Sequence, residues 1–254
     1  MLITEEFHKL INPSFRSQTT LDNENQLPVF GESSETVADA LYRRALKESG
    51  NPLLIRSFYS ELCTFYAQVG AYAATVSSKK GKLYEVGCGL AVPSLAYARM
   101  TGLPTIAMDY SRSEIREAKK LAELLHTHHL SLRRGDGKKI MQKQFHIFPF
   151  PHYSPPEVGS LDTILVVNPV DDRMDTLIRK SNAKNVIYVG GSGKLFGQHE
   201  MYTSLISGIS MWKEWFCKQG IDKELEAGGW NRIVISGQEG DFLRPQMALV
   251  HCSR

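Results

Sequence analysis

The stretch that decides the fold class is Y84-E-V-G-C-G-L-A-V92, in which a short apolar strand runs into two glycines one residue apart. The residues around it predict a strand over 82–86 and a helix over 92–100. Pro93 suits the first turn of that helix, and Gly102 suits its end. Because glycine lets a backbone turn tightly and approach a ligand closely, the stretch fits a nucleotide-binding turn. Taken alone, it fits an ordinary strand-to-helix connection equally well.

Most of the chain after this stretch alternates between strand and helix patterns. Ser111 and Glu114 have the spacing of a capping box at the start of a second helix. Apolar runs predict further strands over 104–108, 130–133, 161–167 and 185–189. Such alternation indicates parallel strands with helices on both faces of one sheet. We therefore predict an α/β, Rossmann-like, doubly wound sheet of seven strands, mostly parallel.

The end of the chain follows a different pattern. A helix through residues 202–216 precedes two apolar runs, 230–236 and 246–252, which are separated by a short segment containing Gly237, Gly240 and Pro245. This separation suits a hairpin, so we expect the last strand to be antiparallel to the others.

The first eighty residues predict another kind of structure. Residues 1–33 are polar and contain prolines, which is typical of an irregular arm. A helix is predicted over 35–49, and a second one where apolar residues from Leu54 to Val76 recur at steps of three and four. We therefore divide the chain into an N-terminal helical arm or lid, residues 1–80, and a ligand-binding α/β domain, residues 81–254.

The composition is that of a globular protein, with 42% hydrophobic and 22% charged residues among 254. A net charge of +3 gives no strong signal for nucleic acid or for an anionic membrane. The first ten residues do not resemble a secretory signal, and no apolar run is long enough to span a bilayer. The four cysteines form no C-x-x-C pair, so we expect no structural zinc and a reducing, cytoplasmic location.

Polar residues stand where the predicted strands end. Asp109 follows the second strand, Asp136 the third and Asn168 the fourth. In open α/β sheets, ligands bind outside the carboxyl ends of the strands. A carboxylate there can accept hydrogen bonds from ribose hydroxyls, and a carboxylate or side-chain amide can bind an adenine amino group. This edge of the sheet is therefore the predicted ligand site.

The third glycine of a dinucleotide fingerprint is missing. The pattern G-x-G-x-x-G would need glycine at position 92, which is valine. The spacing E85-x-G87-x-G89-x-A91 instead resembles the first motif of class I S-adenosylmethionine-dependent methyltransferases, which usually have a glycine where Ala91 stands. The resemblance covers about residues 82 to 190 and continues through Asp109-Tyr110-Ser111, Arg134-Gly135-Asp136-Gly137 and Val167-Asn168-Pro169.

The resemblance implies S-adenosylmethionine as the cofactor and assigns it a set of residues. The backbone of Gly87 to Leu90 would hold the methionine moiety, and Glu85 would order that loop. Asp109 would bind the ribose, Tyr110 would flank the adenine and Asp136 would bind its amino group. The candidate cofactor-binding residues are Glu85, Gly87, Cys88, Gly89, Leu90, Asp109, Tyr110, Asp136, Gly137 and Asn168.

Catalytic residues are much less visible than cofactor-binding ones. Methyl transfer from a sulfonium is an in-line displacement, so alignment of the acceptor can supply much of the acceleration. The run N168-P-V-D171 imperfectly resembles the Asn-Pro-Pro-Tyr motif of amino-group methyltransferases, which makes Asn168 and Asp171 candidates. Capping of the following helix is an equally good interpretation of Asp171.

Other reactive or aromatic residues have simpler interpretations. Tyr59, Tyr66 and Tyr72 are candidates for an acceptor pocket, although their helical spacing also suits core packing. His126, His128 and His129 lie at a predicted helix end without a carboxylate or cysteine to complete a metal site, so we expect no metal. No histidine base accompanies Cys88, so we expect no nucleophilic role for it.

Four functions fit these observations to different degrees. The sequence favours an S-adenosylmethionine-dependent methyltransferase acting on a small or medium-sized acceptor. The alternatives are an aminopropyl or aminobutyl transferase similar to polyamine or nicotianamine synthases, which uses the same kind of site, and a non-catalytic ligand-binding protein that keeps the fold. A nicotinamide-dependent oxidoreductase is disfavoured by Val92 and by the terminal hairpin.

Overall fold

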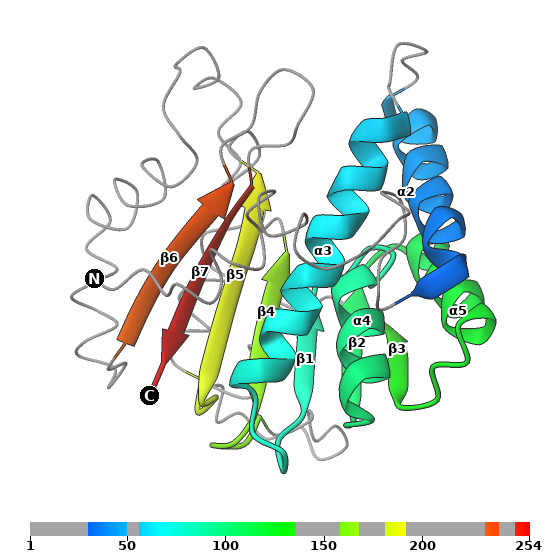
Figure 1. Ribbon diagram of the computed structural model, residues 1–254. Helices are drawn as coiled ribbons and strands as arrows, with labels where there is room; N and C mark the ends of the chain where they lie inside the picture. Colours follow the sequence, from blue (N-terminus) through cyan, green and yellow to red (C-terminus); the bar gives the residue numbers. More distant parts are fainter. Residues whose placement is uncertain (1–29, 50–55, 136–157, 168–180, 192–231, 239–246) are drawn as a thin grey trace.

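The computed structural model describes residues 30–49, 56–135, 158–167, 181–191, 232–238 and 247–254 (Figure 1). These residues contain a seven-stranded sheet in the order β3-β2-β1-β4-β5-β7-β6. The strands are β1 (Leu83–Val86), β2 (Thr105–Asp109), β3 (Leu130–Arg134), β4 (Thr163–Val167), β5 (Asn185–Gly191), β6 (Arg232–Gln238) and β7 (Met247–Ser253).

Strands β1 to β5 are parallel to one another, and β7 is antiparallel to both β5 and β6. The predicted mostly parallel sheet, hairpin and antiparallel last strand are therefore confirmed. Leu83 of β1 is in register with Thr105 of β2 and with Thr163 of β4. Because these strands start in register and run in the same direction, their carboxyl ends meet at one edge of the sheet.

Burial follows the position of each strand in the sheet. Every residue of the central strands β1 and β2 is buried, as expected for parallel strands covered on both faces. In β3, which ends the strand order, no residue is fully buried. The continuous apolar runs in the sequence thus correspond to the inner strands.

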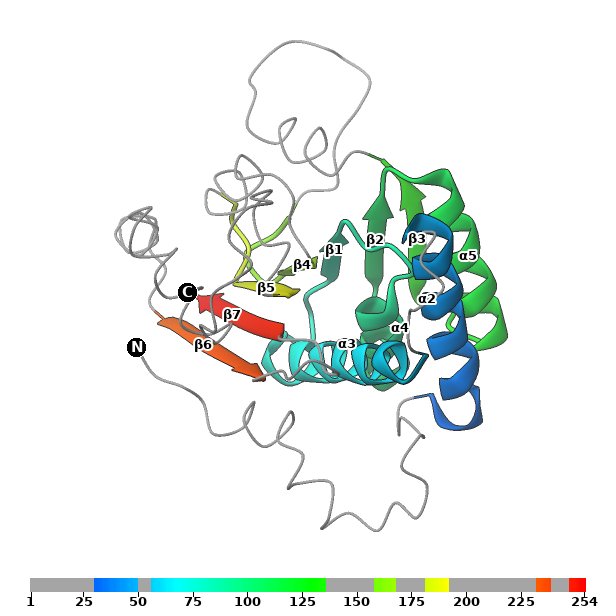
Figure 2. The ribbon, with the colours of Figure 1, turned by 90° about the horizontal axis from the view of Figure 1, so that it is seen from above.

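The helices of the described chain are α2 (Ser34–Ser49), α3 (Arg56–Val76), α4 (Val92–Thr101) and α5 (Arg112–Leu124), preceded by a 3-10 turn, η2 (Gly31–Ser33). Helices α3, α4 and α5 lie on one face of the sheet (Figure 2). The helix predicted over 202–216 lies outside the described residues. No helix in the described part of the chain combines the length and hydrophobicity needed to cross a bilayer.

Helices α3 and α4 pack closely because α3 has a glycine at the point of contact. A Cβ on Gly70 would overlap the carbonyl oxygen of Pro93 and lie 2.8 Å from the Cβ of Ala96. Real Cβ atoms essentially never come this close, so a larger residue at position 70 would push the helices apart.

One hydrophobic core joins the N-terminal helices to the sheet. Val37 of α2, Val69 of α3 and Leu95 of α4 are fully buried in the same cluster as Leu165 of β4 and Ile187 of β5. Helices α2 and α3 are therefore built into the packing of the α/β unit, which fixes where α2 lies relative to the carboxyl ends of the strands.

Candidate functional site

The loop between β1 and α4 has an unusual backbone. Gly87, Gly89 and Ala91 have φ angles of +70°, +51° and +57°, so every second residue is in the left-handed region. Glycine adopts this region without steric cost, whereas for alanine it costs about 1–2 kcal/mol. Ala91 stands where methyltransferases of this class usually have a glycine, and it adopts the left-handed conformation that this position needs.

Backbone hydrogen bonds attach this loop to the end of β2. The N–H groups of Gly87 and Cys88 both donate to the carbonyl oxygen of Met108, at 2.9 Å each. The N–H of Gly89 donates to Oδ2 of Asp109 at 2.8 Å. Hydrogen bonds thus join the glycine loop to the acidic residue at the end of the second strand, twenty residues further along the sequence.

Asp109 also organises the start of α5. Its Oδ1 accepts a hydrogen bond from the Ser111 N–H at 2.8 Å, and Ser111 Oγ accepts one from the Glu114 N–H at 3.4 Å. The predicted N-cap at Ser111 is therefore confirmed, and the structure adds the bond from its N–H to Asp109. A carboxylate has about four acceptor positions, so Asp109 can still accept ligand hydroxyls with both backbone bonds in place.

Glu85 lies beneath the loop and is fully buried. Its Oε2 accepts a hydrogen bond from the Ser94 N–H at 3.1 Å, which caps the first turn of α4. Its Oε1 has no hydrogen-bond partner among the residues that the structure describes. Burial raises the pKa of this carboxyl to about 8; the Ser94 hydrogen bond opposes the shift and the nearby Asp109 adds to it.

The remaining loop residues differ in exposure. Cys88 and Leu90 are buried, and Tyr110 is 77% exposed. Burial, followed by the negative charges of Glu85 and Asp109, raises the pKa of the Cys88 thiol far above its ordinary value. A thiol in this state is a poor nucleophile. Tyr110 instead presents its ring to solvent beside Asp109, where a flat ligand could stack on it.

Several candidates lie outside the described residues: Asp136, Gly137, Asn168 and Asp171. The chain that leads to Asp136 can nevertheless be placed. The N–H of Gly135 donates to the carbonyl oxygen of Asp109 at 2.9 Å, so the end of β3 lies directly beside the end of β2.

The three tyrosines proposed for an acceptor pocket all lie along α3. The rings of Tyr59 and Tyr42 pack 5.6 Å apart, and Tyr66 is buried against Phe65. The hydroxyl of Tyr72 lies 2.7 Å from Nδ1 of His251.

Tyr72 belongs to a chain of buried polar side chains that connects α3 with strands β4, β5 and β7. Nε2 of His251 lies 3.0 Å from Oδ1 of Asn185, whose side-chain amide donates to the Val76 carbonyl and to Oγ1 of Thr163. The amide orientation places the imidazole proton on Nε2, so Tyr72 donates to Nδ1. Asn185 and Thr163 begin their strands, so this network lies toward the amino ends, opposite the glycine loop.

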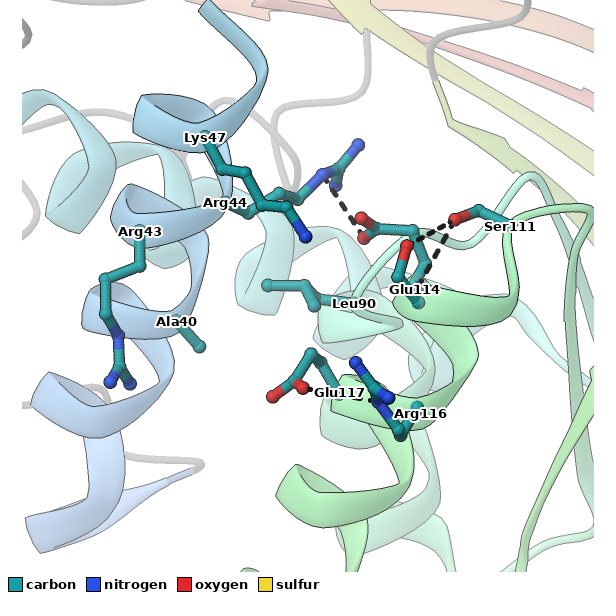
Figure 3. A pocket seen from close by; sticks show the side chains of 10 residues that line it. Ala40, Arg43, Arg44, Lys47, Leu90, Ser111, Glu114, Arg116 and Glu117 are labelled. Atoms are coloured by element: carbon teal, nitrogen blue, oxygen red, sulfur yellow. Dashed lines mark hydrogen bonds and ion pairs between the residues drawn. The ribbon is translucent and has the colours of Figure 1, made fainter. Parts of the chain in front are cut away.

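The structure adds residues that the sequence did not single out. A cavity of about 420 Å³ separates α2 from α5 and reaches Leu90 of the glycine loop (Figure 3). Arg44 of α2 crosses it and forms an ion pair with Glu114 of α5, with 3.2 Å between Nε and Oε2. No local sequence pattern connects Arg44 with the loop, because only the packing of α2 brings them together.

The histidines near the end of α5 form no metal centre in the described part of the chain. His126 follows the helix with a left-handed φ of +51°, and His128 and His129 lie in the turn before β3. Within the described residues, no group of three or more His, Cys, Asp or Glu side chains could hold a metal ion.

Comparison with known proteins shows similarity in structure but not in sequence. The chain matches no family model, and no curated protein matches its sequence. Magnesium protoporphyrin IX methyltransferase (ChlM) from Synechocystis PCC 6803 with bound SAM is similar to it with a TM-score of 0.54, at 14% identity over 87% of this chain and 97% of that one. The same enzyme with bound SAH gives a TM-score of 0.53, at 15% identity over 87% and 99% of the two chains.

These similarities extend over almost the whole length of the solved enzyme. Together with the strand order and the antiparallel β7, they show that the chain has the Rossmann-like fold of class I S-adenosylmethionine-dependent methyltransferases. The resemblance inferred from the glycine loop is confirmed at the level of the fold.

Proposed function

We propose that the protein is a methyltransferase that uses S-adenosylmethionine and acts on a small or medium-sized acceptor. The observation that carries the proposal is the bond between Gly89 and Asp109, which joins the glycine loop of β1 to the acid of β2 at the carboxyl ends of both strands. The Asp109 carboxylate thus stands at the edge of the sheet where ligands bind in this class of fold, and its remaining acceptor positions suit a ribose.

The residues of the site fit S-adenosylmethionine in charge and in shape. Gly87 carries no side chain at the turn, and the space that its Cβ would take is almost open, so a ligand can approach the backbone there. Asp109 would bind the ribose hydroxyls, and the exposed ring of Tyr110 would flank the adenine. The Glu85 carboxyl, with one oxygen unpartnered among the described residues, gives the loop a negative charge that suits a cationic ligand once it ionises.

S-adenosylmethionine, when bound, supplies a methyl group activated by a sulfonium. The work of this chain is then to hold the acceptor close and in line, which by itself accounts for a large share of the rate. Residues 1–80 are proposed to cover the site, since α2 lies beside the glycine loop and borders the same cavity as Leu90. Asp136 and Gly137 for the adenine, and Asn168 and Asp171 for the acceptor, remain proposals from the sequence.

The test compares two buried aspartates that have the same structural task. Asp109 and Asp162 are each 7% exposed, and each accepts hydrogen bonds from two backbone N–H groups at 2.8 Å. Asp162 precedes β4, at the opposite edge of the sheet from the glycine loop. Replacing either residue with asparagine should cost a similar amount of stability, but only Asp109→Asn should weaken the binding of a cofactor at the loop.

Isothermal titration calorimetry with S-adenosylmethionine, S-adenosylhomocysteine and NAD provides the measurement. We expect both sulfur nucleotides to bind to the wild-type protein. Asp109→Asn should weaken their binding by about 1–3 kcal/mol, the cost of losing hydrogen bonds to a charged acceptor. Asp162→Asn should leave both affinities unchanged. Failure of the wild-type protein to bind either sulfur nucleotide would refute the proposal, and methylthioadenosine as by-product would indicate aminopropyl or aminobutyl transfer.

A further inference from the structure

The cavity between α2 and α5 borders the glycine loop, and most of its charged side chains are positive. Its lining residues are Ala40, Arg43, Arg44, Lys47, Leu90, Ser111, Ser113, Glu114, Arg116 and Glu117. Four of these are cationic and two are acidic. Because Leu90 and Ser111 belong to the loops that follow β1 and β2, a ligand held by Gly87 to Leu90 could extend directly into this cavity.

Three of the charged residues in the cavity are matched within α5 or turned away from the loop. Glu117 lies 3.0 Å from Lys120 and 3.8 Å from Arg116, and the Lys120 hydrogen bond lowers the pKa of Glu117. Nε of Arg43 donates at 3.4 Å to the Asp39 carbonyl of its own helix, and in Figure 3 its side chain points away from Glu114.

Arg44 differs from these residues because it reaches the glycine loop itself. A Cβ placed on Gly89 would lie 2.6 Å from Nη1 of Arg44, so the guanidinium covers the Cα of that glycine. The ion pair with Glu114, whose side chain is only 13% exposed, holds the guanidinium in this position. Gly89 therefore has a second reason to lack a side chain, which is the space that the arginine occupies.

A guanidinium fixed above this loop is suited to bind a carboxylate. Arginine presents five N–H donors in a planar fork that matches the two oxygens of a carboxylate, and it stays charged at all physiological pH values. The contact with Glu114 uses Nε, whereas Nη1 is the atom that faces Gly89. A carboxylate on a ligand seated beside the loop could bind the N–H groups of Nη1 and Nη2.

We propose that Arg44 binds the α-carboxylate of the methionine moiety of the cofactor, with Glu114 positioning its guanidinium. The inference rests on the proposed function and adds a specificity to it. A decarboxylated donor, as used in aminopropyl transfer, has no group for Arg44 to bind. Arg44 thereby selects the intact cofactor and favours methyl transfer over aminopropyl transfer at this site.

The experiment uses two ligands that differ only in this carboxylate, S-adenosylmethionine and its decarboxylated form. Their dissociation constants are measured by calorimetry for the wild-type protein, for Arg44→Gln and for Arg43→Gln. The last variant is the matched control, because it removes the same charge from the adjacent position of α2. Thermal unfolding of each variant shows whether α2 stays packed.

We expect the wild-type protein to prefer S-adenosylmethionine over the decarboxylated form. Arg44→Gln should weaken the affinity for S-adenosylmethionine about 10- to 100-fold, in the range of charge-assisted hydrogen bonds. It should change the affinity for the decarboxylated ligand less than about threefold. Arg43→Gln should leave both affinities as they are.

The other outcomes overturn the inference separately from the proposed function. An equal loss of affinity for both ligands in Arg44→Gln would mean that the arginine only supports the loop. An equal effect of Arg43→Gln would mean that overall charge matters and not the position of Arg44. A wild-type protein that binds both ligands equally well would keep the proposed function and exclude a carboxylate site, whereas binding of neither ligand would remove both proposals.

Discussion

Replacing Glu85 with glutamine should change how the stability of the protein depends on pH. The Glu85 carboxyl is fully buried, and burial raises its pKa from 4.5 to about 8. In the unfolded chain, the same carboxyl loses its proton near its ordinary pKa of 4.5. Folding therefore binds a proton between these two pH values, and raising the pH across this window opposes folding.

The size of the effect follows from the shift in pKa. The proton on Glu85 contributes its full stabilisation to the folded protein below the pKa of the unfolded chain. This contribution decreases by up to about 1.4 kcal/mol per pH unit as the pH rises, and it is lost once the pH exceeds about 8. The total is on the order of 3–6 kcal/mol, a large part of the usual 5–15 kcal/mol of a folded domain.

Glutamine should remove this pH dependence with little change in packing. It has nearly the same volume as protonated glutamate, and its carbonyl oxygen can accept the hydrogen bond from the Ser94 N–H. Near pH 5, Glu85→Gln and the wild-type protein should have similar stability. By pH 8, the variant should be more stable by several kcal/mol, on the order given by the pKa shift.

The assay is urea unfolding followed by circular dichroism at pH 5, 6, 7, 8 and 9, without ligand. The quantity of interest is the difference in unfolding free energy between the variant and the wild-type protein, because other titrating groups cancel in it. Glu117→Gln is the control, since the exposed Glu117 has a lowered pKa and its difference should stay constant above pH 5. A Glu85→Gln difference that is also constant from pH 5 to pH 8 would refute the reasoning.

Two further predictions concern packing away from the loop. Gly70→Ala should destabilise the protein by about 1–3 kcal/mol in urea unfolding, although alanine favours a helix, because its Cβ would overlap the carbonyl of Pro93; an unchanged or higher stability would contradict the close contact. Tyr72→Phe should cost about 1–3 kcal/mol, because a buried nitrogen of His251 loses its donor, and should leave the affinity for S-adenosylhomocysteine unchanged. Weaker binding by this variant would instead connect Tyr72 with the ligand site.

Local patterns in the sequence were enough to predict most elements of the fold. The strand that ends at Val86, the helix that ends before Gly102 and the Ser111 cap all lie where spacing and composition placed them. These features depend on neighbouring residues, whose periodicity and turn chemistry are visible in the chain itself. For the same reason, Gly87, Gly89 and Asp109 could be assigned to one site, since parallel strands bring their carboxyl ends together.

Other parts of the site depend on contacts between residues distant in the chain. The capping-box spacing predicted the Ser111 cap, but not the bond from the Ser111 N–H to Asp109 or the ion pair between Glu114 and Arg44. The left-handed conformation of Ala91 is likewise set by the loop geometry and not by the preference of alanine.

The sequence by itself determined the class of fold, and it predicted the edge of the sheet where a ligand would bind and the kind of ligand that the glycine loop suits. Only the tertiary structure decided that Arg44 covers Gly89, that Tyr72 joins a buried network with His251, and that Gly70 lets two helices touch. The physical reason is that periodicity specifies which face of an element is apolar but not which residue it meets. Those contacts are fixed by the packing of α2 and α3 into the shared core.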